Sequence, residues 1–160
     1  MFPDVERGVV FELDSRKAQA LAVQRPSWSV YEADSKKALA AGAAKHLSFN
    51  MIDIDPYGDP WAVIESVFTL DRPLASEIAI TVNDGLHRKL KVQGAWSVKV
   101  LAPMVAHFGN HGLDTRYLEA CRWNMDRIVE AVGYKVREWT AYHCGMSMTM
   151  THYAAHLTRQ

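Results

Sequence analysis

The sequence is short of several features that would assign a protein to a class directly. Its two cysteines, Cys121 and Cys144, have no Cys-x-x-Cys spacing. Free thiols in a reducing compartment are therefore expected, rather than a disulfide framework. No apolar run approaches the roughly 20 residues that span a bilayer, and no basic segment followed by an apolar one opens the chain. We expect a cytoplasmic protein without a membrane partner.

Net charge is also absent, because 18 lysines and arginines balance 18 aspartates and glutamates over 160 residues. This balance argues against strong, indiscriminate nucleic-acid binding but leaves room for a local basic patch. The chain has no repeat, linker or low-complexity tract. Its length suits a single domain covering residues 1–160.

A metal-ligand pattern is lacking as well. Asp53 and Asp55 suggest the start of a calcium loop, but the EF-hand pattern needs a glutamate where Ile64 stands. Two histidine pairs have i, i+4 spacing: His107 with His111, and His152 with His156. Neither pair has a carboxylate or cysteine at ligand spacing, so we expect surface or core histidines and no metal.

Strand and helix patterns alternate along the first half of the chain. Predicted strands cover residues 8–14, 28–34, 47–55 and 76–83, and predicted helices cover 15–25, 35–46 and about 60–71. Such alternation is typical of a parallel sheet with right-handed crossovers and helices on both faces. The predicted fold class is therefore α/β, a three-layer sandwich.

The second half is less regular. Residues 85–112 are expected to form a long connection, with a helical part over 96–107 that Pro103 makes uncertain. An amphipathic helix capped by Asp114 follows, and strands at 135–143 and 147–156 then form an antiparallel hairpin around Gly145. The period-2 stripe of Met146, Met148 and Met150 predicts the buried face of the last strand.

The most distinctive stretch is Asp55-Pro56-Tyr57-Gly58, which ends the third predicted strand. Asp53 and Asp55 are two residues apart and point to the same side of the sheet, towards the crevice where open α/β sheets bind ligands. Pro56 and Gly58 then turn the chain sharply. The plainer alternative is a strand-to-helix turn with Asp59 as the helix cap.

Together with two earlier strand ends, this stretch resembles the class I S-adenosylmethionine-dependent methyltransferases over residues 8–156. In that family an acidic residue near the end of the second strand binds the ribose, and Glu12 stands there. An acidic residue ending the third strand receives the adenine amino group, and Asp34 stands there beside Ala33. The fourth strand ends in Asp/Asn-Pro-Pro-Tyr or a relative, and the Asp-Pro-aromatic-Gly form most resembles the tRNA guanine-N2 methyltransferases.

The resemblance implies a Rossmann-like fold and S-adenosylmethionine as cofactor. The residues that it assigns to the cofactor are Glu12, Ala33, Asp34 and Asp53. The acceptor would be an exocyclic amine of a nucleobase, held by Asp55 and the Pro56 carbonyl while Tyr57 stacks on the base. Gly58, Arg88 and Lys89 would contact the nucleic acid, RNA in preference to DNA, although basic residues in a loop are usually only solvated.

The chain departs from the family pattern on the cofactor side. The first strand, the Gly-rich loop and the following helix would precede Gly8, where the sequence has seven residues, and no Gly-x-Gly occurs in the chain. Three explanations stay open: a fragment or reduced relative, a partner chain or second copy that supplies the missing wall, or a catalytically inactive binding or structural subunit. Asp14 and Asp34 also have a plainer role as helix caps.

Overall fold

The computed structural model describes residues 7–56, 58–69, 72–93 and 99–160. The chain divides into two compact units, Met1–His46 and Leu47–Gln160, and each is described separately. Whether they act as the single predicted domain stays a prediction. In the described ranges no helix combines the length and the apolar character needed to cross a membrane.

The first unit alternates strands and helices. It contains β1 (Val9–Glu12), α1 (Ser15–Gln24), β2 (Ser29–Glu32) and α2 (Ser35–Ala40). The two strands are parallel, with Glu12 opposite Glu32 at their carboxyl ends. Helix α2 ends six residues before the predicted end, and Gly42, whose φ is +85°, has a backbone conformation that does not continue a helix.

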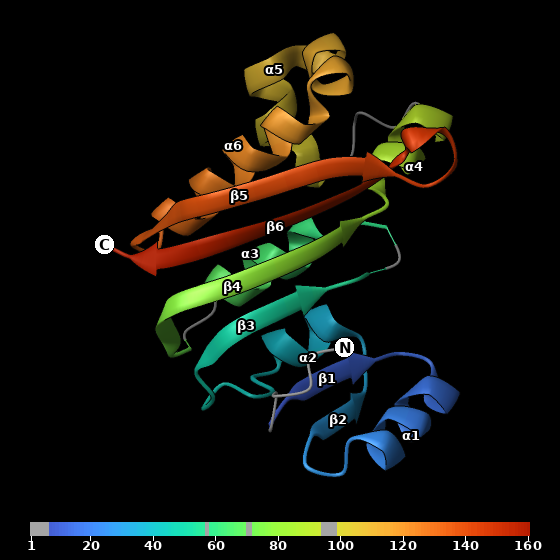
Figure 1. Cartoon of the computed structure of the whole chain (residues 1–160), viewed down its shortest axis with the longest axis vertical. Helices are drawn as coiled ribbons and strands as arrows, with labels where there is room; N and C mark the ends of the chain where they lie inside the picture. The colour runs from blue at the N-terminus through green and yellow to red at the C-terminus, as the bar shows by residue number, and fades with distance from the viewer. Residues whose placement is uncertain (1–6, 57, 70–71, 94–98) are drawn as a thin grey trace. The chain divides into compact units, whose positions relative to one another are not determined.

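The second unit contains one four-stranded sheet (Figure 1). Its elements are β3 (Phe49–Ile54), α3 (Trp61–Thr69), β4 (Leu74–Asp84), α4 (Leu86–Gln93), η1 (Lys99–Leu101), α5 (Ala102–Thr115), α6 (Tyr117–Glu130), β5 (Tyr134–Cys144), η2 (Met146–Met148) and β6 (Met150–Arg159). The strand order is β3-β4-β6-β5, with β3 and β4 parallel and the other pairs antiparallel. The predicted α/β class with a C-terminal antiparallel hairpin is confirmed.

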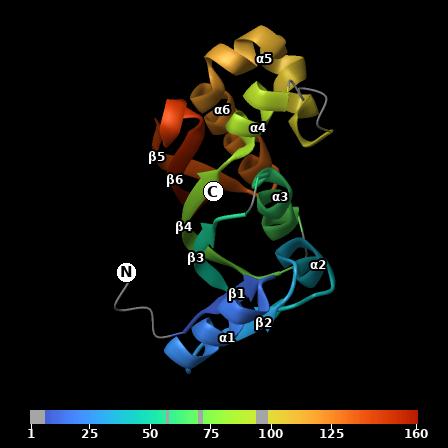
Figure 2. The same cartoon turned by 90° about the vertical axis from the view of Figure 1, so that its right-hand side faces the viewer.

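One face of this sheet forms the core of the second unit, because α3 and α6 both pack on it (Figures 1 and 2). Ile78, Ile80 and Val82 alternate along β4 and are buried. Trp61 is fully buried in α3 and stacks on Tyr153 of β6, with 5.7 Å between ring centroids. Burying a large apolar side chain contributes roughly 1.5–3 kcal/mol, so this face supplies much of the stability of the unit.

The connection expected over residues 85–112 contains more helix than predicted, since α4 was not expected, whereas α5 overlaps the predicted helical part at 96–107. Helix α4 begins directly after β4, and Pro103 lies in the first turn of α5, where its missing N–H costs no helical hydrogen bond. Asp114 was also misplaced as a cap. It lies inside α5, and α6 begins at Tyr117 after Arg116.

The predicted methionine stripe was wrong too. Met146 and Met148 are 94% and 58% exposed, and β6 begins only at Met150. The hairpin connection is wider than a tight turn at Gly145. It includes a short 3-10 segment in which Ser147 and Met148 have positive φ, and this segment carries the two methionines out of the strand.

Candidate functional site

The loop after β3 carries the predicted acceptor residues. Asp55 is exposed immediately beyond the last strand residue, Ile54. The Pro56 carbonyl accepts a hydrogen bond of 2.8 Å from the Gly58 amide, and Gly58 has a φ of +112°. Tyr57, the predicted stacking residue, lies outside the described residues. The sharp turn expected from Pro56 and Gly58 is thus present.

The loop after β4 lies directly against this turn. A Cβ atom placed on Gly85 would be 3.7 Å from the Cα of Gly58 and 3.7 Å from the Sδ of Met150. The carboxyl ends of β3 and β4 and the first residue of β6 therefore meet at one edge, which we call the carboxyl edge. In open α/β sheets ligands bind outside this end of the parallel strands.

Two more aspartates support the loop after β3. The Oδ1 of Asp59 accepts a hydrogen bond of 2.9 Å from the Trp61 amide, so Asp59 caps the start of α3 as predicted. The Oδ1 of Asp53 accepts a hydrogen bond of 2.5 Å from the Thr81 hydroxyl on the neighbouring strand. Asp53 is exposed on the same side as Asp55 by strand alternation, and its side chain is tied to β4.

A buried carboxyl group lies at the end of β4. Asp84 is fully buried, its Oδ1 accepts from the Leu86 amide at 2.7 Å, and its Oδ2 accepts from the Tyr117 hydroxyl at 2.9 Å. Burial raises the pKa of Asp84 to about 7, although both hydrogen bonds act in the opposite direction. The neighbouring hydroxyl of Tyr153 is buried and makes no hydrogen bond within 3.5 Å among the described residues.

Sequence reasoning missed Asp84 as a buried residue, and a signal for it was present. Ile78, Ile80 and Val82 alternate towards the core, and the same alternation places residue 84 on the buried side. The Asp-Gly pair that follows was interpreted only as the end of the strand. Asp84 is instead the first link between β4 and α4, because its carboxyl group accepts from the Leu86 amide.

His87, the second residue of α4, extends this buried polar cluster. It is 2% exposed, and its ring stacks between those of Tyr117 and His143, with centroids 4.5 and 5.1 Å away. Burial lowers the pKa of His87 to about 4, so its ring is neutral at pH 7. Neither ring nitrogen has a hydrogen-bond partner within the described residues, and the nearest carboxylate oxygen, on Asp114, is 3.9 Å from Nε2.

No three histidine, cysteine, aspartate or glutamate side chains of the described ranges are grouped as metal ligands.

The residues predicted to bind a cofactor lie in the first unit, apart from Asp53. The Ala33 amide donates to the Glu12 carbonyl at 3.0 Å, so these two residues are joined at the strand ends. Oε1 of Glu12 accepts from the Asp14 amide at 2.8 Å, and Oδ1 of Asp34 accepts from the Lys37 amide at 2.9 Å. The bond from Lys37 lowers the pKa of Asp34, which keeps this carboxylate ionised.

Asp34 therefore caps α2, and Asp14 caps α1 through the amides of Arg16 and Lys17. A cap uses only part of the hydrogen-bonding capacity of a carboxylate, which has about four acceptor positions. The capping role thus leaves Asp34 able to accept from a ligand.

Of the basic residues predicted to contact a substrate, Arg88 is exposed on α4. Lys89 follows it on the same helix, and its side chain lies outside the described part of the chain. Lys91, one turn further on, lies 3.9 Å from Asp114 and is 43% exposed. The exposed cations follow directly from the end of β4, as the sequence suggested, but on a helix rather than a loop.

Comparison with known proteins gave structural similarities only. No family model matches the sequence, and no curated protein matches it. Among solved structures, the chain is similar to yhhF of Escherichia coli, assigned as a methyltransferase, with a TM-score of 0.47 and 15% identity over 95% of this chain. It is also similar to M1.HpyAVI, with TM-scores of 0.41 alone and 0.42 in its complex with SAM, and 11% identity over 81% of this chain.

The chain spans 64% of the length of yhhF, and 54% and 55% of the two M1.HpyAVI chains.

Proposed function

We propose that the chain takes part in S-adenosylmethionine-dependent methyl transfer to an exocyclic amine of a nucleobase in nucleic acid, with RNA, and tRNA in particular, as the first candidate. The observation that carries the proposal is the carboxyl edge of the second unit. There an exposed carboxylate, Asp55, follows a parallel strand and leads into a tight turn closed onto Gly85. The motif resemblance at Glu12 and Asp34 supports the same function.

The chemistry explains why a carboxylate is needed. The lone pair of an exocyclic amine is delocalised into its ring, so the nitrogen is a weak nucleophile. Asp55 accepts one N–H bond of the amine and the Pro56 carbonyl accepts the other, which turns the lone pair towards the methyl donor. The Pro56 carbonyl already accepts from Gly58, but a carbonyl oxygen has a second lone pair. As the new N–C bond forms, the S–CH3 bond of the sulfonium donor would break and its electron pair would stay on the sulfur as a neutral thioether. The nitrogen would then lose a proton, which Asp55 is placed to take.

The residues proposed to bind the cofactor have side chains that suit its polar groups. S-adenosylmethionine supplies an electrophilic methyl group when bound. Glu12 and Asp34 are carboxylates at the ends of neighbouring parallel strands, where acceptors suit the hydroxyls of a ribose and the amino group of an adenine. Ala33, joined to Glu12 through its amide, lies between β2 and Asp34 and provides a small side chain beside them.

Calorimetric titration of the whole chain with S-adenosylmethionine tests the cofactor assignment. Transfer of a tritium-labelled methyl group to unfractionated tRNA then tests the acceptor side. The Asp55→Asn variant keeps the size of the side chain and removes its charge. It should bind the cofactor with nearly unchanged affinity and lose methyl transfer by about 100-fold or more, the range of general acid–base contributions.

Asp126→Asn is the matched control, because Asp126 is a partly exposed aspartate paired with Arg122 on α6. It should retain wild-type transfer. An Asp55→Asn protein that methylates tRNA at the wild-type rate would remove Asp55 from its role. No heat at millimolar S-adenosylmethionine would exclude a self-sufficient enzyme and favour the alternative, a methyltransferase-like binding or structural subunit that needs a second copy or another chain.

A further inference from the structure

The sheet of the second unit has a second face, away from α3 and α6, which we call the outer face. Its central residues are Asp53, Ala79, Thr81, Asn83, Glu138, Thr140, Tyr142, His152, Ala154 and His156. Met51, opposite Ala79, and Met150, opposite Cys144, lie at the margins of this face. The central residues include no aliphatic side chain larger than that of alanine, whereas the opposite face contains Ile80, Val82 and Leu157. No helix in the described part of the second unit covers the outer face (Figures 1 and 2). A sheet face of this polarity is typical of contact with water or a polar ligand, not of a packed apolar helix.

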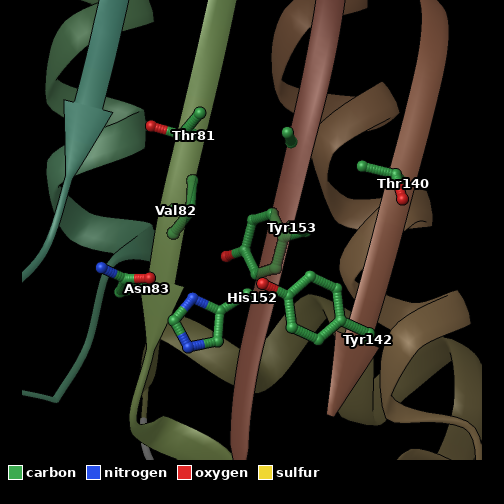
Figure 3. A pocket seen from close by; sticks show the side chains of 8 residues that line it. Thr81, Val82, Asn83, Thr140, Tyr142, His152 and Tyr153 are labelled. Carbon is green, nitrogen blue, oxygen red and sulfur yellow. The ribbon is translucent and has the colours of Figure 1, made fainter. Parts of the chain in front are cut away.

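Cross-strand registry arranges the outer face in rows. One row has small side chains and runs from Asp53 through Thr81 and Ala154 to Thr140. The next row, towards the carboxyl edge, has larger side chains and runs from Asn83 through His152 to Tyr142. The small row leaves a hollow of about 140 Å³, bounded by the larger row (Figure 3).

The large row contains two aromatic rings in a fixed arrangement. Tyr142 and His152 lie across β5 and β6 with ring centroids 5.4 Å apart and an angle of 10° between their planes. Tyr142 is 56% exposed, so its ring is accessible from the hollow and from solvent. Parallel, accessible rings beside hydroxyl and amide groups favour a flat ligand with polar edges.

The polar groups of the hollow indicate which kind of ligand it can bind. Thr140 and Asn83 offer donors and acceptors, and the Thr81 hydroxyl, which donates to Asp53 at the end of the small row, offers an acceptor. No lysine or arginine lines the hollow, so it is unsuited to a phosphate group. Neutral hydrogen-bonding groups beside aromatic rings match a nucleobase instead.

We propose that the hollow beside Tyr142 and His152 binds a nucleobase one or two nucleotides away from the one that is methylated, and so sets the sequence context of the substrate. Val82 of β4 is paired with Ile54 of β3, so the residues that follow them, Asn83 and Asp55, are next in the two strands. Asp55 is thus level with the row of Asn83, His152 and Tyr142, and two to three strand spacings of about 4.8 Å separate it from the two rings. This separation of roughly 10–14 Å corresponds to one or two nucleotides of an extended single strand. This proposal rests on the proposed function for its role, and its binding site can be tested without methyl transfer.

The test is a titration of the whole chain with adenosine monophosphate and with single-stranded RNA trinucleotides, followed by the aromatic NMR signals of Tyr142 and His152. Saturable shifts of both rings are expected. Tyr142→Ala should weaken trinucleotide binding by about fivefold to 150-fold, as expected for one lost stacking contact. Ala154→Leu fills the hollow from the outward face without touching the core, and should weaken binding comparably while both rings remain. Lys135→Ala, on the same face at its far end, is the control and should bind as wild type does.

Trinucleotide affinity unchanged by both Tyr142→Ala and Ala154→Leu would place the nucleotide elsewhere and overturn the proposal. The absence of any saturable shift at millimolar ligand would also overturn it. Methyl transfer to tRNA separates this result from the proposed function. If the wild type methylates tRNA but shows no base binding at the hollow, only the role of the hollow is rejected. If the wild type binds bases at the hollow but does not methylate tRNA, only the proposed methyl transfer is rejected.

Discussion

The buried carboxyl group at the end of β4 makes a quantitative prediction about stability and pH. Asp84 titrates near pH 3.8 when exposed in the unfolded chain and near pH 7 in the fold. Between these values the folded protein holds a proton that the unfolded chain has lost. The contribution of Asp84 to stability is therefore complete below about pH 4 and is lost as the pH rises through 7.

The expected size follows from the separation of the two pKa values, from 3.8 to about 7. Each pH unit corresponds to about 1.4 kcal/mol, so the whole effect is on the order of 4 kcal/mol, of which about 3 kcal/mol falls between pH 5 and pH 8. A domain is typically stable by about 5–15 kcal/mol. The pH-dependent contribution of this single carboxyl group is therefore a substantial part of the free energy of unfolding.

The perturbation is Asp84→Asn, which keeps an acceptor for the Leu86 amide and cannot ionise. Urea denaturation of wild type and variant, followed by tryptophan fluorescence at intervals from pH 5 to pH 8, gives the free energy of unfolding of each. Wild type should lose about 3 kcal/mol relative to the variant across this range. His87 acts in the opposite direction, because its pKa is lowered and its contribution is lost as the pH falls. It is present in both proteins and cancels in the difference.

Asp34→Asn is the contrasting control. Its pKa is lowered by the Lys37 amide, so its contribution is lost only on acidification below its ordinary value of 3.8. Its difference from wild type should stay constant from pH 5 to pH 8. If wild type and Asp84→Asn have parallel stability profiles over this range, the buried carboxyl group does not titrate as burial dictates, and the reasoning fails.

Two further predictions concern packing in the separate units. Trp61→Ala should lower the free energy of unfolding of the second unit by about 3–5 kcal/mol, because the side chain is fully buried against Tyr153. Trp61→Phe should cost less, since it keeps an aromatic ring and removes a buried indole N–H without a partner in the described residues; equal losses in urea denaturation would contradict this. In the first unit a Cβ on Gly8 would lie 2.6 Å from the Trp28 ring. Gly8→Ala should therefore destabilise that unit by about 1–3 kcal/mol, and an unchanged thermal midpoint in scanning calorimetry would refute the clash.

Local sequence signals were sufficient to predict those features that depend on one residue or on a short repeating pattern, such as a helix cap or a strand. Asp14 and Asp34 precede helices and do cap them, and Asp59 caps α3. The alternation of Ile78, Ile80 and Val82 correctly predicted β4. These features depend on hydrogen bonds and side-chain periodicity within a few residues, and such information is present in the sequence itself.

Prediction failed where a local signal had two structural solutions. Asp84-Gly85 is compatible with a turn, but tertiary burial of the carboxyl group makes it the start of α4. Pro103 is compatible with a helix break, but also with a helix start, which is its actual position. The cluster of Asp84, Tyr117 and His87 could not be predicted as a cluster. Its members are brought together by β4, α6 and α4, and only the folded chain sets their distances.

The position of β6 between β4 and β5 has a consequence for the order in which the second unit is completed. β4 pairs with β3 on one side, a short distance along the chain, but its other ladder joins Glu77 to Thr158 and Asp84 to Thr151. During synthesis β4 therefore keeps one edge unpaired until β6, which begins at Met150, has left the ribosome. Pairing of β6 with β4 closes this side of the sheet, and chains halted before β6 expose the unpaired edge of β4 to other nascent chains.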